Sequence, residues 1–274
     1  MRMYERLIKD CGLALIGLFC VFAGEALAAS SPQLTLKNLS LCQVHQHEYL
    51  TEYHIFAADP GDPSHRSDLQ KAQASASECV GSVEADLKVY GLGSQAAEIR
   101  QKYSAFDTAL HQNLVSIGKK GAPEFEVLNV MVLNELDLES SLSKAANDLQ
   151  AQQKVRVTPQ VEQARQLAVL MQYMAARYIE RATSAGGSAA RDDSKEATID
   201  DLAKQFGKGL EALKNNPSNA ADVKRELATI VTKWRFIQGS LIDYNQKTVP
   251  FTVDLHSRSI VALLEQVADK IEPH

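Results

Sequence analysis

Aromatic side chains and long apolar runs are both scarce in this 274-residue chain. Phe, Trp and Tyr make up 6% of the residues, with a single Trp, whereas Ala, Leu, Gln, Glu and Lys are plentiful. This composition favours helices over a β-sandwich. The longest apolar run, Leu13 to Ala23, has only about a dozen residues, and a membrane-spanning helix needs about 20. The sequence therefore predicts an all-α protein.

An excess of basic residues is also absent. The chain has 29 Lys and Arg residues against 34 Asp and Glu residues, which gives a formal net charge of −5. Proteins that bind nucleic acid or anionic lipid usually present a basic patch. Neither class of partner is therefore expected.

Catalytic and cofactor motifs are absent as well. The chain contains no His-Glu-x-x-His, no Gly-x-Ser-x-Gly and no phosphate-binding loop. The absence of Cys-x-x-Cys-His excludes covalent haem. A non-covalent haem held by Met171 or Met174 stays open, although methionines at helical spacing more often fill a core. We expect a protein that is not an enzyme and has no cofactor.

The first 28 residues have the pattern of a cleaved export signal. Arg2, Arg6 and Lys9 precede the apolar run, and the small residues of Ala26-Leu27-Ala28 place the cleavage before Ala29. The signal holds three basic and three acidic residues, so the mature net charge stays at −5. We expect a periplasmic protein with no membrane span in the mature chain; an uncleaved anchor is the alternative.

Two of the four cysteines leave with this signal, and Cys42 and Cys79 remain. A disulfide can persist in an oxidising compartment such as the periplasm. The turn signal at residues 59–63 lies nearly midway between the two cysteines. If helices flank that turn, the two side chains end up side by side, as a disulfide requires. We predict this disulfide; two separate buried thiols are the alternative.

Apolar residues spaced three and four apart predict eight helices. They cover about residues 34–56, 67–90, 94–117, 124–149, 159–178, 199–213, 220–244 and 250–271. A Gly- and Ser-containing loop is expected at 184–196. The Gln-rich stretch at 150–153 is either a loop or part of one long rod that joins the fourth and fifth helices.

The second set of four helices resembles a copy of the first. The apolar spacing that begins at Tyr103 in the third helix recurs 131 residues later, beginning at Trp234 in the seventh. Four amphipathic helices can close a bundle around one core. We therefore predict two tandem antiparallel four-helix bundles, over residues 29–153 and 154–274.

The densest polar cluster lies on the first predicted helix and consists of His45, His47, Glu48, Glu52 and His54. His47 and His54 are seven residues apart and share a helix face, so they are the candidates for a metal site. No metal-binding motif surrounds them. We therefore expect a solvated face with one or two packed histidines, and no metal.

One stretch of the fifth predicted helix carries a family resemblance. Leu170, Gln172, Met174, Ala175 and Tyr178 match the pattern Arg-Gln-Arg-Met-Leu-Ser-Gln-Arg-Met-Ala-x-x-Tyr in register. The stretch resembles the first-helix signature of the PilJ-type sensor domain, the N-terminal periplasmic module of type IV pili methyl-accepting chemotaxis transducers. The resemblance covers about residues 160–270 and extends to residues 34–150 only through the internal repeat.

The resemblance implies a sensor, usually a homodimer, that binds a small ligand near the first helix of a bundle. Related nitrate sensors neutralise the anion with arginines, but the corresponding positions here, Gln166 among them, hold no arginine. Arg165 and Arg177 lie just outside those positions and are candidates for contacts to an anion. With Gln166 and Gln172 they form the predicted ligand-binding set. The alternative is that both arginines are solvated helix charges.

Two functions of different classes follow as hypotheses. In the first, the mature chain is a soluble periplasmic ligand-binding or sensory module that reports to a membrane-bound signalling or pilus-associated partner, since no second span or signalling domain follows. In the second, it is a structural or adaptor bundle that has lost ligand binding. A metal or haem carrier is a more distant alternative.

Overall fold

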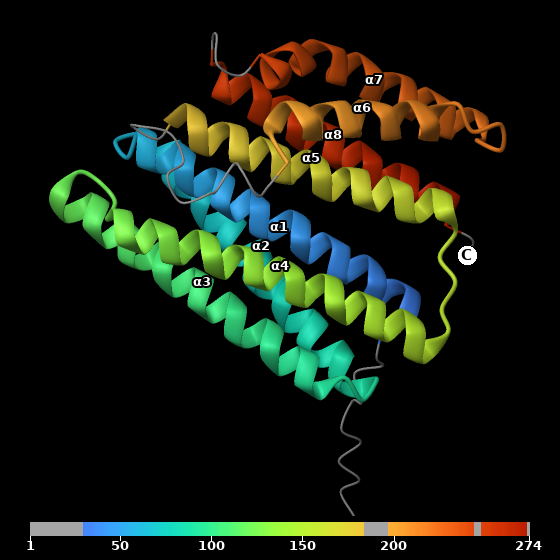
Figure 1. The fold of residues 1–274 in the computed structure, drawn as a ribbon, viewed down its shortest axis with the longest axis horizontal. Helices are drawn as coiled ribbons and strands as arrows, with labels where there is room; N and C mark the ends of the chain where they lie inside the picture. The colour runs from blue at the N-terminus through green and yellow to red at the C-terminus, as the bar shows by residue number, and fades with distance from the viewer. Residues whose placement is uncertain (1–29, 184–196, 244–247, 273–274) are drawn as a thin grey trace, which may run out of the picture.

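The computed structural model describes residues 30–183, 197–243 and 248–272, and the regular structure within these ranges is entirely α-helical (Figure 1). Its eight helices are α1 (Pro32–Ala58), α2 (Pro63–Val89), α3 (Gly93–Lys120), α4 (Phe125–Gln153), α5 (Pro159–Thr183), α6 (Ile199–Lys214), α7 (Ala221–Ile242) and α8 (Pro250–Ile271). The all-α prediction is confirmed, with helix bounds within a few residues of those expected. The predicted signal peptide (residues 1–28) and the predicted loop at 184–196 lie outside the described residues.

Short polar side chains and glycine set several helix ends. Ser31, Asp62 and Thr198 precede α1, α2 and α6, and each side-chain oxygen accepts a hydrogen bond from a backbone N–H two or three residues further on. At the other end of a helix, Gly121 follows α3 with φ 75°. Glycine adopts this left-handed conformation without strain, so the chain can turn there towards α4.

α4 and α5 are separate helices. α4 continues through the Gln-rich stretch to Gln153, and Lys154 then has φ 52°, a left-handed conformation that ends the helix. α5 begins at Pro159, which has no N–H for a continuing helix to use. The Gln-rich stretch is therefore helical, and the single long rod does not form.

The helices form two rings of four (Figure 1). In the first ring α1 and α3 each pack against α2 and α4, and in the second α5 and α7 each pack against α6 and α8. Each ring encloses its own cluster of buried apolar side chains. Tyr103 and Trp234, the equivalent residues of the internal repeat, are both buried in these clusters. The structure thus has the tandem four-helix bundles that the repeat predicts.

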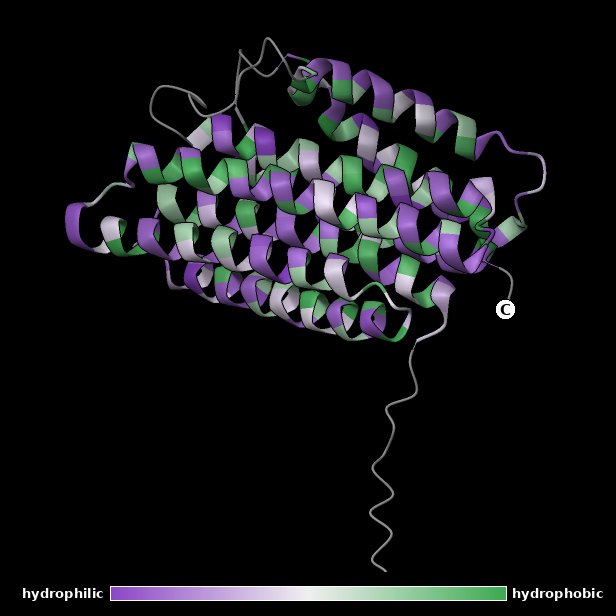
Figure 2. Cartoon of the chain, turned by 60° about the horizontal axis from the view of Figure 1, so that its bottom comes forward, coloured by the Kyte–Doolittle hydropathy of each residue, from purple (hydrophilic) through white to green (hydrophobic). Residues whose placement is uncertain are grey.

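Every helix carries both hydrophilic and hydrophobic residues (Figure 2). In a bundle the apolar stripe of such a helix faces the shared core and the polar stripe faces outward. Within residues 30–183, 197–243 and 248–272, no helix has an apolar stretch long enough to cross a bilayer.

The two bundles meet along α1 and α5, which lie side by side (Figure 1). Near the start of both helices, Arg165 of α5 and Ser40 of α1 line the same cavity. Two turns further along α5 and three turns further along α1, Gln172 donates a hydrogen bond to Thr51, at 3.4 Å. α1 and α5 therefore run parallel.

The apolar cores of the two bundles reach into this joint. Val44 and Ile55 of α1 belong to the buried cluster of the second bundle, and Ala176 of α5 belongs to that of the first. The joint is therefore packed like a protein interior, and side chains that face it are removed from water.

A disulfide joins α1 to α2. Cys42 and Cys79 are bonded, with their Cα atoms 5.5 Å apart. α1 ends at Ala58 and α2 begins at Pro63, so the two helices form an antiparallel hairpin in which the cysteines lie opposite each other. The predicted pairing is confirmed, and disulfides persist mainly in oxidising compartments.

Removal of the disulfide should destabilise the protein. The bonded residues are 37 positions apart, and closing a loop of that length stabilises the native state by about 3–4 kcal/mol through the entropy of the unfolded chain. We expect the double variant Cys42→Ser, Cys79→Ser to lose helical circular dichroism at a melting temperature about 10 °C lower. A reductant should lower the melting temperature of the wild type and leave the double variant unchanged. Equal melting temperatures for both proteins without reductant would contradict a stabilising disulfide.

Candidate functional site

α1 and α5 bury many polar side chains. Those on α1 include Gln46, His47, Thr51, Glu52 and His54, and those on α5 are Arg165, Gln172, Arg177 and Glu180. The expected solvated face of α1 is wrong for Glu52, because α2, α4 and α5 surround this helix, whereas the buried His47 and His54 agree with the expected one or two packed histidines. Polar groups that are removed from water need partners inside the protein, and two clusters on α1 show how these are supplied.

His47 is fully buried between two glutamates of α4. Its Nδ1 lies 2.7 Å from a Glu135 oxygen, and its Nε2 lies 2.9 Å from a Glu139 oxygen. The two glutamates are four residues apart and share a face of α4. Glu135 is fully buried, whereas the side chain of Glu139 is 29% exposed. The ring of Tyr173 in α5 lies 5.2 Å from the imidazole, so α1, α4 and α5 all meet at His47.

The two glutamates control the charge of His47. Burial alone lowers the pKa of His47, because the imidazolium loses its hydration. The negative charges and contacts of Glu139 and Glu135 outweigh burial and raise the pKa of His47 to about 9. His47 is therefore cationic at neutral pH when no other ligand is bound. With both glutamates ionised, the cluster still carries one excess negative charge.

The sequence predicted His47 as a candidate but missed its partners. Glu135 and Glu139 lie 88 and 92 residues further along the chain, and no short motif links them to His47. One signal was present: Glu135 lies between Val132 and Leu138 on the buried stripe of α4, where an apolar residue is usual. His54, the other predicted metal candidate, is buried but is not part of the His47 cluster.

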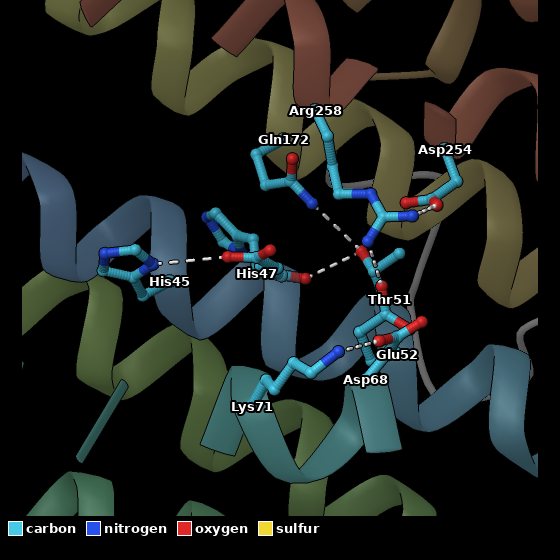
Figure 3. A network of polar contacts seen from close by, with 10 residues as sticks. His45, His47, Thr51, Glu52, Asp68, Lys71, Gln172, Asp254 and Arg258 are labelled. Carbon is cyan, nitrogen blue, oxygen red and sulfur yellow. Dashed lines mark hydrogen bonds and ion pairs between the residues drawn. The ribbon is translucent and has the colours of Figure 1, made fainter. Parts of the chain in front are cut away.

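A second buried charged cluster joins α1 to α8 (Figure 3). The guanidinium of Arg258 in α8 lies 3.1 Å from an oxygen of Glu52 and 2.5 Å from an oxygen of Asp254. The two acidic side chains are 4% and 5% exposed, whereas that of Arg258 is 40% exposed. One partly solvated cation thus serves two buried carboxylates.

Burial shifts the titration of both acids towards neutral pH. It raises the pKa of Glu52 to about 7, with repulsion from Asp254 adding to the effect and Arg258 opposing it. It likewise raises the pKa of Asp254 to about 6, against the attraction of Arg258. The charge of the contact between α1 and α8 therefore changes between about pH 5 and pH 8.

A cavity of about 440 Å³ lies where α1, α4 and α5 meet. Its volume is in the range of small-molecule binding sites. The lining side chains include Ser40 and Gln43 of α1, Glu139 and Ser143 of α4, and Arg165, Gln166 and Tyr173 of α5. Through Glu139 and Tyr173 the cavity adjoins the His47 cluster.

The structure separates the four predicted ligand-binding residues into two pairs. Arg165 and Gln166 line the cavity. Gln172 is buried and donates a hydrogen bond to α1, while Arg177 donates to the carbonyl oxygen of Ala197 at 2.5 Å; neither lines the cavity. The residues Arg165 and Arg177 are 8% and 5% exposed, so the alternative of two solvated helix charges is wrong.

Neutralising Glu52 should change how stability depends on pH. The native state holds a proton on Glu52 up to about pH 7, whereas the unfolded chain releases it near its ordinary pKa of about 4.3. Unfolding therefore releases a proton in this window, and the stabilising contribution falls as pH rises through it. We expect Glu52→Gln, which mimics the protonated form, to match the wild type near pH 4 and to exceed its free energy of unfolding by about 3 kcal/mol at pH 8. Denaturant unfolding at both pH values measures the difference.

Glu78→Gln provides the control, because Glu78 is exposed on α2. Its effect on the free energy of unfolding should be small and the same at both pH values. A difference between wild type and Glu52→Gln that does not vary with pH would show that Glu52 titrates normally.

Known proteins do not identify this site. Comparisons of the chain with protein-family models, with curated proteins and with solved structures find no match. Its function is therefore inferred from the side chains of the site and from the family resemblance within α5.

Proposed function

We propose that this chain is an exported, non-catalytic helical-bundle protein that binds a small organic anion in the cavity between α1, α4 and α5. In this proposal it acts in the periplasm and reports the ligand to a membrane-bound partner. The observation that supports it best is the position of Arg165, a buried cation on the wall of a cavity of ligand size.

Arg165 has hydrogen-bonding capacity left for a ligand. One terminal nitrogen of its guanidinium lies 2.8 Å from a carboxylate oxygen of Glu272. Its Nε is buried and has no hydrogen-bond partner within the part of the chain that the structure describes. A buried donor without an acceptor destabilises a protein by about 1–3 kcal/mol. An anionic group in the cavity would remove that penalty and gain a charge-assisted hydrogen bond.

The rest of the lining suggests the class of ligand. Leu36, Val169 and Leu170 contribute apolar surface, and Glu139 and Glu162 contribute negative charge. A small carboxylic acid with an apolar part suits the side near Arg165, and an amine or another donor on the same molecule suits the side near Glu139. Amino acids combine these features.

The family resemblance supports a sensory role. It implies a ligand site near the first helix of a bundle, and α5 and α1 are the first helices of the two bundles. A ligand in the cavity would contact both helices and so both bundles. If it binds one relative position of the bundles better than another, it shifts their equilibrium, and a membrane-bound partner can detect that shift.

A thermal-shift screen of residues 29–274 tests the proposal. The compounds are small carboxylates, amino acids, nitrate and nitrite. A ligand at 100 times its Kd stabilises the native state by about 2.7 kcal/mol, which raises the melting temperature by about 5–10 °C for a chain of this size. We expect a rise of this order with at least one carboxylate or amino acid, and its loss in Arg165→Gln.

Arg156→Gln is the matched control, because Arg156 is exposed in the connection between α4 and α5. It should keep the full ligand-dependent rise. No rise with any compound, together with a protein that co-purifies stably, would favour the structural or adaptor bundle instead. An unchanged ligand-dependent rise in the melting temperature of Arg165→Gln would show that the ligand binds outside this cavity.

A further inference from the structure

The cluster of His47, Glu135 and Glu139 has the composition of a metal site. One imidazole nitrogen and one oxygen from each glutamate lie within 4.8 Å of one another. The three residues come from two helices of one bundle, and His47 and Glu135 are fully buried. We propose that this cluster binds one divalent transition-metal ion, with these three side chains as its protein ligands.

The geometry of the contacts between His47 and the two glutamates fits a shared metal ion better than it fits hydrogen bonds. Both ring nitrogens of His47 are buried and close to carboxylate oxygens, at 2.7 and 2.9 Å, yet neither contact has the alignment of a hydrogen bond. Two ligands of a tetrahedral ion at 2.1 Å lie about 3.4 Å apart. The two glutamates lie beside different ring nitrogens, whereas one ion binds only one of these nitrogens. The glutamate beside the other nitrogen would therefore have to rotate towards the ion, from a position where the three ligand atoms lie within 4.8 Å of one another.

The charge of the cluster points in the same direction. Two ionised glutamates and a neutral imidazole carry a charge of −2, and buried charge of one sign is costly unless it is compensated. A divalent ion neutralises it completely, whereas a proton on His47 leaves one negative charge. The formal charges of the three side chains are therefore compatible with a divalent cation.

The donor atoms favour particular ions. Imidazole nitrogen suits Zn²⁺, Fe²⁺, Ni²⁺ and Cu²⁺, and carboxylate oxygen suits Mg²⁺, Ca²⁺ and Mn²⁺. A site with one nitrogen and two carboxylates therefore favours Zn²⁺, Mn²⁺ or Fe²⁺ over Mg²⁺ and Ca²⁺. Glu139 also lines the cavity, so water or a small ligand in the cavity can reach an ion bound to Glu139. Such a molecule would occupy a coordination position that the three side chains leave open.

A second group of potential metal ligands is more exposed and already has other hydrogen-bonding partners. Asp59, Asp62 and His65 lie in the turn between α1 and α2, where Asp59 is exposed. Asp62 already accepts hydrogen bonds from the backbone and side chain of Ser64. This group serves as the comparison for adventitious binding.

Metal analysis of chelator-treated protein tests the proposal. Residues 29–274 are dialysed against Zn²⁺ or Mn²⁺, and bound metal is measured by mass spectrometry. We expect about one equivalent in the wild type and a loss of at least tenfold in affinity in His47→Gln and Glu139→Gln. Mg²⁺ and Ca²⁺ should bind more weakly. Co²⁺ should give visible absorption bands that both variants lack.

His45→Gln and His65→Gln are the matched controls. His45 pairs with Glu48 on the same helix, at 3.3 Å, and belongs to no group of three potential ligands among the residues that the structure describes. Both controls should keep the bound ion. If His47→Gln fails to fold, Glu139→Gln decides the outcome, because its side chain is partly solvated. No stoichiometric ion in the wild type, or an ion retained by Glu139→Gln but lost in His65→Gln, would overturn the proposal. The metal-binding experiment contains no organic anion, so its result does not depend on whether the cavity binds one.

Discussion

Charged side chains that are buried beside α1 lose their contact with water and need charged or hydrogen-bonding partners inside the protein. The arrangement of the helices around α1 depends on this requirement. An ion buried without compensation costs several kcal/mol, which is a large part of the stability of a typical domain. Two glutamates of α4 therefore pair with His47 of α1, and an arginine of α8 pairs with Glu52 of α1. These contacts restrict how α4 and α8 can lie against α1 more tightly than apolar packing alone would.

α1 is consequently linked to its neighbours by different kinds of interaction. A disulfide at Cys42 holds it to α2, the ion pairs of His47 hold it to α4, and Glu52 connects it to α8 of the other bundle. Apolar residues such as Val44 and Ile55 continue into the second core. A molecule or ion that binds beside α1 is therefore in contact with elements that belong to both bundles. This connection gives the proposed ligand cavity and the proposed metal site a physical route to influence how the bundles lie together.

The sequence was most informative about features that depend on neighbouring residues. Helix ends followed from prolines, glycines and short polar side chains, and the pairing of Cys42 with Cys79 followed from their nearly equal distances to one turn. The sequence was least informative about the outward face of α1. Helical periodicity separates a polar stripe from an apolar one, and a polar stripe usually faces water. Here a second bundle covers part of that stripe, which amphipathicity alone cannot reveal, so His47, Glu52 and His54 are buried.

By itself, the sequence determined the eight helices, their grouping into two similar sets and the disulfide, because these follow from spacings within one helix or one hairpin. Only the tertiary structure decided that α1 and α5 lie parallel at the joint, that Arg165 and Gln166 line a cavity whereas Gln172 and Arg177 do not, and that Glu135 and Glu139 meet His47. The reason is that these side chains are brought together from helices far apart in the chain, and their proximity depends on how whole helices pack.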